Sequence, residues 1–277
     1  MNLEELKSMA GDIRVDIVKM VAEAGSGHPG GSLSAADIMC ALYFGGVLKH
    51  DAENPKAEDR DRFLLSKGHA APALYATLAE AGYFPKEELA TLRKLHSRLQ
   101  GHPDCKKLPG VEASTGSLGQ GLSIAAGMAL GLRLNGSESS VFTLMGDGEC
   151  QEGQVWEAAM FAAHKGLDNL VAIVDHNHLQ IDGRIETVCS PEDLGDKFRS
   201  FGWQVFQCDG NDMEAILATL ESAKESRSGK PCVIVAETTK GKGVSFMEDQ
   251  AGWHGKAPNA EQTEQALAEL TANKEAK

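Results

Sequence analysis

From residue 141 onwards the sequence alternates short apolar runs with segments of helical periodicity. Runs of this length are typical of buried strands, and strands that alternate with helices favour a parallel sheet. Such a sheet is covered by helices on both faces. The pattern predicts an α/β fold with strands at 141–145, 169–175, 203–208 and 232–237, and helices near 153–165 and 211–226.

The first half of the chain is predicted to be mostly helical. A long amphipathic helix is broken by the cluster Gly25–Gly31, and a short strand is expected at 63–66. No repeat or low-complexity linker divides the chain, so residues 1–277 are interpreted as a single domain that ends in a charged helical tail, about 261–277. The helices are expected at 3–24, 34–44, 71–81, 86–96 and 121–134.

The charge of the chain argues against nucleic-acid or membrane partners. Its net charge is −13, from 27 basic and 40 acidic residues, and the basic residues form no block. The N-terminus lacks the apolar core of a signal peptide, and no run reaches the ~20 apolar residues of a membrane helix. Six cysteines occur without a C-x-x-C pair, which favours reduced thiols and a cytoplasmic location.

Two polar residues follow consecutive predicted strands. Asp147 lies in GDG directly after the first, and Asn177 comes after the next. Because ligands bind outside the carboxyl ends of parallel strands, these oxygen donors are candidates for Mg²⁺ or Ca²⁺. Gly148 allows close approach of a phosphate, and the helix near Gly153 adds a positive dipole end. A turn or cap role for Asp147 stays open on this pattern alone.

Histidines provide a second signal. His28, His69 and His102 lie in Gly-His pairs within glycine-rich loops, and His254 lies in Trp-His-Gly. No H-x-x-x-H spacing indicates zinc on one helix, so proton transfer and hydrogen bonding to a polar substrate are the favoured roles. His176 and His178 flank Asn177 and are interpreted as orienting or surface groups.

These motifs carry a resemblance to a known family. GDG followed about thirty residues later by Asn resembles the thiamine diphosphate motif, in which Mg²⁺ clamps the diphosphate of the cofactor. The chain also contains, in the family's order, GSGHPGG, LSKGHAAPALY, GHPD, TGSLGQG, GDGECQEG, TKGKG and WHGKAP. Along almost its whole length it is therefore similar to the N-terminal, diphosphate-binding half of transketolase.

The resemblance implies a role for each matching residue. The metal, Mg²⁺ with Ca²⁺ or Mn²⁺ as substitutes, would be held by Asp147, Asn177 and the Leu179 carbonyl. The catalytic residues would be His28, His102 and His254. Thiamine diphosphate would be bound by Lys67, His69, Gly116, Leu118, Gly148, Glu152, Asn177, Ile181, Lys240 and His254.

Some of these roles have simpler alternatives. Lys67 and Lys240 could equally be solvated surface lysines, and Glu152, matched to an interface residue of the family, could be a plain helix-start glutamate. Ser117 stands where many members have proline, so that loop should be less preset.

The resemblance also implies a partner. The family's pyrimidine-binding domain should begin where this chain ends, so the chain resembles the N-terminal subunit of a two-chain transketolase with two copies of each chain (α2β2). That enzyme would move a two-carbon unit from a ketose phosphate to an aldose phosphate in the pentose phosphate pathway. Alternatives are a deoxyxylulose-phosphate synthase-like or 2-oxo-acid enzyme, a transketolase for branched or sulfonated sugars, a non-catalytic cofactor-binding protein, or a piece of a longer chain.

Overall fold

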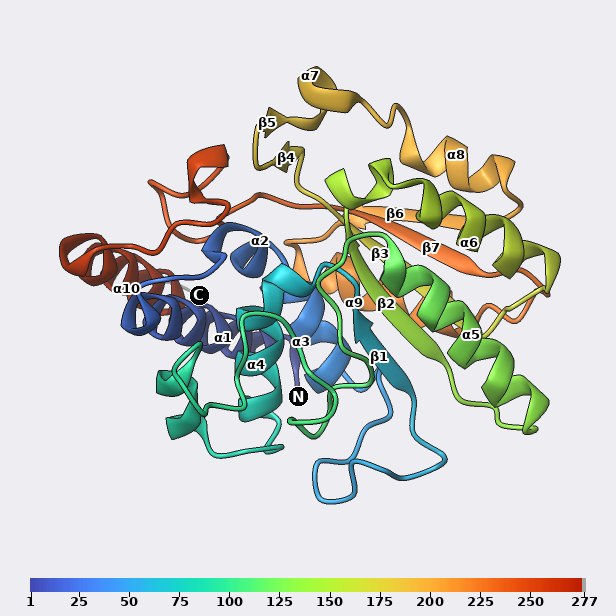
Figure 1. Ribbon diagram of the computed structural model, residues 1–277, viewed down its shortest axis with the longest axis horizontal. Helices are drawn as coiled ribbons and strands as arrows, with labels where there is room; N and C mark the ends of the chain where they lie inside the picture. Colours follow the sequence, from blue (N-terminus) through green and yellow to red (C-terminus); the bar gives the residue numbers. More distant parts are fainter. Residues whose placement is uncertain (276–277) are drawn as a thin grey trace.

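A five-stranded parallel sheet forms the centre of the computed structural model, which describes residues 1–275 (Figure 1). The strand order is β1-β2-β3-β7-β6, and every neighbouring pair is parallel. The predicted fold class and all five predicted strands of this sheet are confirmed, with ends that differ by at most one residue. The bounds are β1 Arg62–Leu65, β2 Val141–Gly146, β3 Leu170–His176, β6 Gln204–Asp209 and β7 Cys232–Glu237.

Helices cover both faces of this sheet (Figure 1). Side chains alternate between the faces along each strand, so Ile173 packs into one core while Ala172 and Val174 pack into the other. The first core contains α1 Leu3–Ala24, α3 Ala36–Phe44 and α4 Ala71–Glu80 from the first half of the chain, and α9 Met213–Glu225 from the second. The second core contains α5 Gln120–Leu134, α6 Gly153–His164 and α8 Leu194–Ser200.

The first helix has the predicted bounds because both of its ends are encoded locally. Asn2 and Glu5 form a reciprocal capping box at its start. At its end Gly25 adopts a left-handed conformation with φ 60°, which glycine allows at little cost. The predicted tail helix is observed as α10 Ala260–Glu275, and it packs against α1. Residues 276 and 277 of the predicted tail lie outside the described residues.

Two predictions about the first half were wrong. The Gly25–Gly31 break is shorter than predicted, because a separate helix, α2 Pro29–Ser34, begins at the proline, whose fixed φ suits a first helical turn. The predicted helix 86–96 is only a short 3₁₀ helix, Lys86–Thr91, since Arg93 and His96 have positive φ values of 59° and 66°.

Small elements between residues 179 and 200 were not predicted. They comprise the hairpin β4 Leu179–Gln180 and β5 Gly183–Arg184, the helix α7 Ile185–Cys189, and α8. Each is too short to give a clear periodic pattern. Three further 3₁₀ turns lie at Gly68–Ala70, Gly148–Gln151 and Ala251–Trp253. Among residues 1–275, no helix has both the length and the apolar character needed to cross a membrane.

Candidate active site

Polar residues and glycine-rich loops meet where three neighbouring strands end. β2, β3 and β7 are adjacent and parallel, so their carboxyl ends lie on one edge of the sheet. Asp147 directly follows β2, Asn177 directly follows β3, and Lys240 lies three residues beyond β7. This edge is where parallel sheets bind ligands. The structure thus brings three of the predicted residues to one place.

Asp147 and Asn177 present buried oxygen atoms at this edge. The Asp147 carboxylate accepts hydrogen bonds from the backbone N–H of Gly148 at 2.7 Å and of His178 at 2.6 Å. Burial and the neighbouring Asp175 charge raise the pKa of Asp147 to about 6. By accepting from Gly148, Asp147 caps the short 3₁₀ helix that follows, which was its alternative role. Its carboxylate keeps further lone pairs that can bind a cation.

The Leu179 carbonyl, proposed as the third metal ligand, already accepts a hydrogen bond from the Lys240 ammonium. Lys240 Nζ donates to the Leu179 carbonyl at 2.7 Å and lies 2.9 Å from His254 Nδ1. Burial lowers the pKa of Lys240 to about 8. Lys240 and Lys67 are 2% and 1% exposed, so the alternative that they are surface lysines was wrong.

The site is stabilised by a buried ion pair that the sequence analysis missed. Asp175, at the end of β3, pairs with the Lys67 ammonium, and both side chains are fully enclosed. Burial alone would raise the pKa of Asp175, but the charge and hydrogen bonds of Lys67 outweigh it and lower the pKa. The same carboxylate accepts from Ser34 Oγ at 2.6 Å, from Asn177 Nδ2 at 3.1 Å, and from the Thr238 hydroxyl.

This pairing determines how Asn177 faces the site. Because the Asn177 amide nitrogen donates to Asp175, its oxygen points the other way, where it accepts from the Leu179 N–H at 3.2 Å. An amide oxygen held in this orientation is suited to a hard cation. The signal that could have identified Asp175 is a lone carboxylate within an otherwise apolar strand.

Glu149 is a second buried carboxylate that the sequence analysis did not assign. Its oxygens accept from Gly119 N at 2.9 Å, from Gly146 N at 3.0 Å, and from the Ser66 hydroxyl. Burial nevertheless raises its pKa. Glu149 thereby joins three of the motif loops, those after β1 and β2 and the one before α5.

Three of the four predicted histidines form a triangle beside this edge. The ring centroids of His28, His69 and His254 are 5.1–5.5 Å apart. Burial, with a smaller contribution from nearby cations, lowers the pKa of His28 to about 4 and that of His254 to about 3. The pKa of His69 is lowered in the same way. Neutral imidazoles can each donate and accept a hydrogen bond, which suits contact with polar ligands.

His102 lies next to the triangle and is exposed. Gly116 has a φ of 144°, and a methyl group in place of its hydrogen would approach the His102 ring at 3.0 Å, so both the backbone and the close contact favour glycine. Arg93, which the sequence analysis did not single out, lies 3.4 Å from His28 Nδ1, and its charge contributes to the lowered pKa of both His28 and His102.

The remaining predicted residues surround the site at the surface. Leu118 and Ile181 are exposed, and Ile181 lies at the tip of the β4–β5 hairpin with 65% of its surface accessible. Glu152 is exposed at the start of α6 without a side-chain cap bond, and Gly119 packs against it. Gly148 lies between Asp147 and the hairpin residue Gln180. The site is therefore open on the side formed by these residues.

The Lys67–Asp175 pair leads to a stability prediction. Asp175→Asn would leave a buried ammonium without a counter-ion, and we expect the free energy of unfolding to fall by about 3–5 kcal/mol. Urea denaturation measures this loss. Asp182→Asn, at the exposed tip of the hairpin, is the matched control and should change it by less than about 0.5 kcal/mol. Equal losses in the two variants would contradict the role of the pair.

The lowered histidine pKa values predict acid sensitivity. An unfolded histidine takes up a proton near pH 6.5, whereas folded His254 does so only near pH 3, so its contribution is complete above about pH 6.5 and is lost as the pH falls. Asp147 acts in the opposite direction, so the test compares variants. Between pH 7 and 5, His254→Gln should lose about 1 kcal/mol less than the wild type, allowing for partial exposure. His164→Gln, at the exposed end of α6, should follow the wild type in thermal unfolding.

Comparison with known families agrees with this geometry. Residues 6–277 match the family described as "Transketolase, thiamine diphosphate binding domain". The chain is 44% identical over 266 residues to the 6-deoxy-6-sulfo-D-fructose transketolase subunit SqwG of Clostridium sp. (strain MSTE9), covering 96% of each chain. It is 43% identical to one subunit of the apulose-4-phosphate transketolase of Phocaeicola vulgatus, covering 98% of this chain and 95% of the relative.

Solved structures give the same result. The crystal structure of transketolase from Campylobacter jejuni superposes with a TM-score of 0.90 at 35% identity. The match covers 100% of this chain but only 46% of the Campylobacter jejuni chain. The chain thus spans less than half of that transketolase and nearly all of the two subunit relatives. The chain therefore belongs to the transketolase family, whose thiamine diphosphate-binding domain it represents.

Proposed function

We propose that this chain is the diphosphate-binding subunit of a two-chain transketolase, which moves a two-carbon glycolaldehyde unit from a ketose phosphate to an aldose phosphate. The observation that carries the proposal is the edge of the sheet where Asp147 and Asn177 lie beside three neutral histidines. The near-complete coverage of relatives that are themselves named as subunits supports a separate partner chain.

The donor set at this edge fits a hard divalent cation. A carboxylate, an amide oxygen and a backbone carbonyl are the ligands that Mg²⁺ takes together with phosphate oxygens. Asp147, Asn177 and the Leu179 carbonyl would provide them, with Ca²⁺ or Mn²⁺ as substitutes. The raised pKa of Asp147 supports this assignment, because a bound cation would compensate the buried charge.

The loops around the cation fit the cofactor. His69, His254 and Lys240 would donate to the diphosphate oxygens, Lys67 would add its charge from below, and Gly148 would approach through its backbone. The pyrimidine side would be lined by Gly116, Leu118 and Ile181, with Glu152 at the adjoining interface. When bound, thiamine diphosphate supplies the electron sink for breaking a carbon–carbon bond beside a carbonyl.

The histidines of this chain would handle the sugar. His28 is half-buried, His102 is exposed, and Arg93 lies beside His28. Because their pKa values are lowered, they are neutral near pH 7 and can hydrogen-bond sugar hydroxyls as donor or acceptor. His254 would contribute both to this contact and to the diphosphate contact. Together these residues would orient the sugar and transfer its protons.

The second half of the site would come from a partner. We assign this role to a C-terminal transketolase subunit with the pyrimidine-binding domain, assembled with this chain as α2β2. The open side of the site supports it, as do the exposed apolar residues of the neighbouring helices α5 and α6 (Figure 1). These residues are Leu134, Met160 and Phe161. The net charge of −13 supports an enzyme that binds neither nucleic acid nor membrane. We place this enzyme in the cytoplasm and in the pentose phosphate pathway as part of the same proposal.

Two classes of sugar are candidates for the substrate. Ordinary pentose phosphates are the first, but the two subunit relatives are named for a sulfonated fructose and for apulose 4-phosphate. The histidines here would contact only hydroxyls near the reacting carbons, so a partner that recognises the far end of the sugar would set the specificity. Both classes must therefore be tested.

A reconstitution experiment tests the activity. This chain, its partner, thiamine diphosphate and Mg²⁺ should convert xylulose 5-phosphate and ribose 5-phosphate to sedoheptulose 7-phosphate, and the chain alone should be nearly inactive. Parallel reactions with 6-deoxy-6-sulfofructose and apulose 4-phosphate as donors separate the two sugar classes. No product from any donor would support a non-catalytic cofactor-binding role, and pyruvate consumption would indicate a deoxyxylulose-phosphate synthase-like enzyme.

Two substitutions separate cofactor binding from turnover. We expect Asp147→Ala to weaken thiamine diphosphate retention at least about tenfold, because a metal ligand is lost. His28→Ala should retain the cofactor but lower turnover by about 10²–10⁴-fold, because a proton-handling group is lost. Calorimetric titration and steady-state kinetics of the reconstituted complex measure the two effects. Equal cofactor retention in Asp147→Ala and the wild type would refute the metal assignment.

A further inference from the structure

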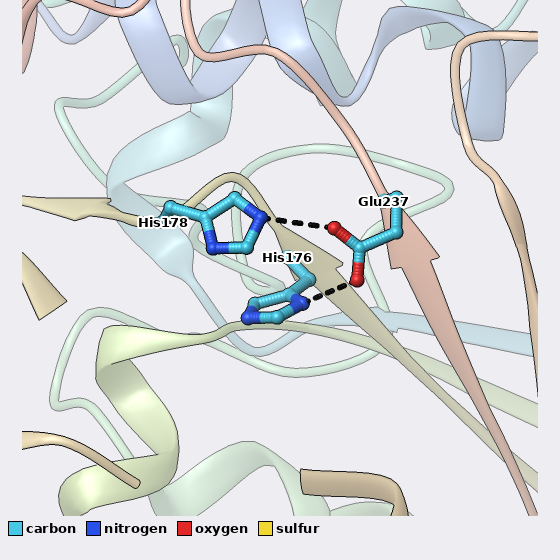
Figure 2. A group of neighbouring side chains, drawn as sticks. All are labelled: His176, His178 and Glu237. Carbon is cyan, nitrogen blue, oxygen red and sulfur yellow. Dashed lines mark hydrogen bonds and ion pairs between the residues drawn. The ribbon is translucent and has the colours of Figure 1, made fainter. Parts of the chain in front are cut away.

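Three side chains beside the cofactor edge form a separate cluster that the transketolase function does not use. Figure 2 shows the rings of His176 and His178 directed at the carboxylate of Glu237. His176 Nδ1 lies 2.7 Å from one carboxylate oxygen, and His178 Nε2 lies 2.9 Å from the other. The three ligand atoms are all within 4.8 Å of one another.

The cluster joins residues that are distant in sequence. The two histidines come from the end of β3 and the residues that follow it, and Glu237 is the last residue of β7. Parallel pairing of the two strands places His176 opposite Glu237. No sequence motif indicates such a site, since the carboxylate comes about sixty residues after the histidines.

His178 is held in place from two sides. Its backbone is left-handed, with φ 62°, an uncommon conformation for a residue other than glycine. Its ring Nδ1 lies 3.1 Å from the Glu186 carboxylate and donates to it, while Nε2–H donates to Glu237 in the metal-free structure. Nε2 would give up this proton when a metal binds, and the ring would stay oriented by Glu186. A carboxylate that orients a histidine from behind is the usual outer-shell arrangement of zinc-bound histidines.

We propose that His176, His178 and Glu237 bind one divalent transition-metal ion of the Zn²⁺ class, distinct from the cation that holds the diphosphate. Two imidazole nitrogens and one carboxylate oxygen are a common set of three protein ligands for Zn²⁺, with water as the fourth ligand. The oxygen-only donors at Asp147 suit Mg²⁺ instead. Neighbouring sites with different donor chemistry can thus select different metals.

The geometry requires only a small adjustment. With zinc–ligand distances of about 2.0–2.1 Å, tetrahedral ligand atoms lie about 3.3 Å apart. The present separations of 2.7 and 2.9 Å are those of hydrogen bonds, so the carboxylate must withdraw by roughly half an ångström. Glu237 has a side chain that is 51% exposed and has room for this movement.

Metal titration of the full chain tests the proposal. In the presence of excess Mg²⁺ and thiamine diphosphate, which occupy the cofactor edge, we expect saturable binding of one Zn²⁺ per chain by isothermal titration calorimetry. His178→Asn and Glu237→Gln should each weaken this binding at least about tenfold. Substituting Co²⁺ should give a visible spectrum of nitrogen and oxygen ligation, without the thiolate bands that binding to a cysteine would produce.

A matched variant controls for the backbone. His96 is exposed and also has a left-handed conformation, φ 66°, which asparagine tolerates, so His96→Asn makes the same chemical change outside the cluster. It should bind Zn²⁺ like the wild type. Thermal unfolding midpoints close to that of the wild type would show that all variants fold. The proposal is overturned if wild type shows no saturable Zn²⁺ binding, or if His178→Asn binds as tightly as His96→Asn.

Discussion

The buried pair between Lys67 and Asp175 is the interaction on which the arrangement of the site depends. Asp175 lies near the end of the central strand β3, and Lys67 precedes the turn that contains His69. Through its carboxylate oxygens Asp175 also binds Ser34 of α2 and Thr238 after β7. Segments from four parts of the sequence therefore share one charged group. A buried carboxylate with several partners is costly to desolvate, but it admits very few alternative arrangements of the loops around it.

The layers of the fold could be predicted from the sequence because their signals are local. The apolar runs around Ile173 and Ile234 have the length and composition of buried strands, and the Asn2 and Gly25 caps determine both ends of the first helix. The wrong predictions lie where contacts with the rest of the protein override the local conformational preference of the residues. Pro29 starts a helix within a glycine cluster, and the 3₁₀ helix from Lys86 ends at Thr91, two residues before the left-handed Arg93.

The site was predicted unevenly, for a similar reason. Asp147, Asn177 and the loop histidines belong to motifs of adjacent residues, so the resemblance to a family could indicate them as candidates. Asp175 and Glu149 act by contacts with residues about 30 to 140 positions away in the chain, which no short pattern encodes. The same holds for Glu237 beside His176, since pairing between strands, not spacing along the chain, brings them together.

The hydrogen bond from Lys240 to the Leu179 carbonyl has a consequence for how the cofactor enters. If the Leu179 carbonyl is the metal ligand proposed above, a metal ion arriving alone would compete with this ammonium and leave it with His254 as its remaining hydrogen-bond partner. A metal that arrives already complexed to the diphosphate offers the displaced ammonium new anionic oxygens in the same step. With the proposed ligand set, loading would be an exchange of one cation for another, and joint delivery of the metal with the cofactor would be favoured over sequential uptake.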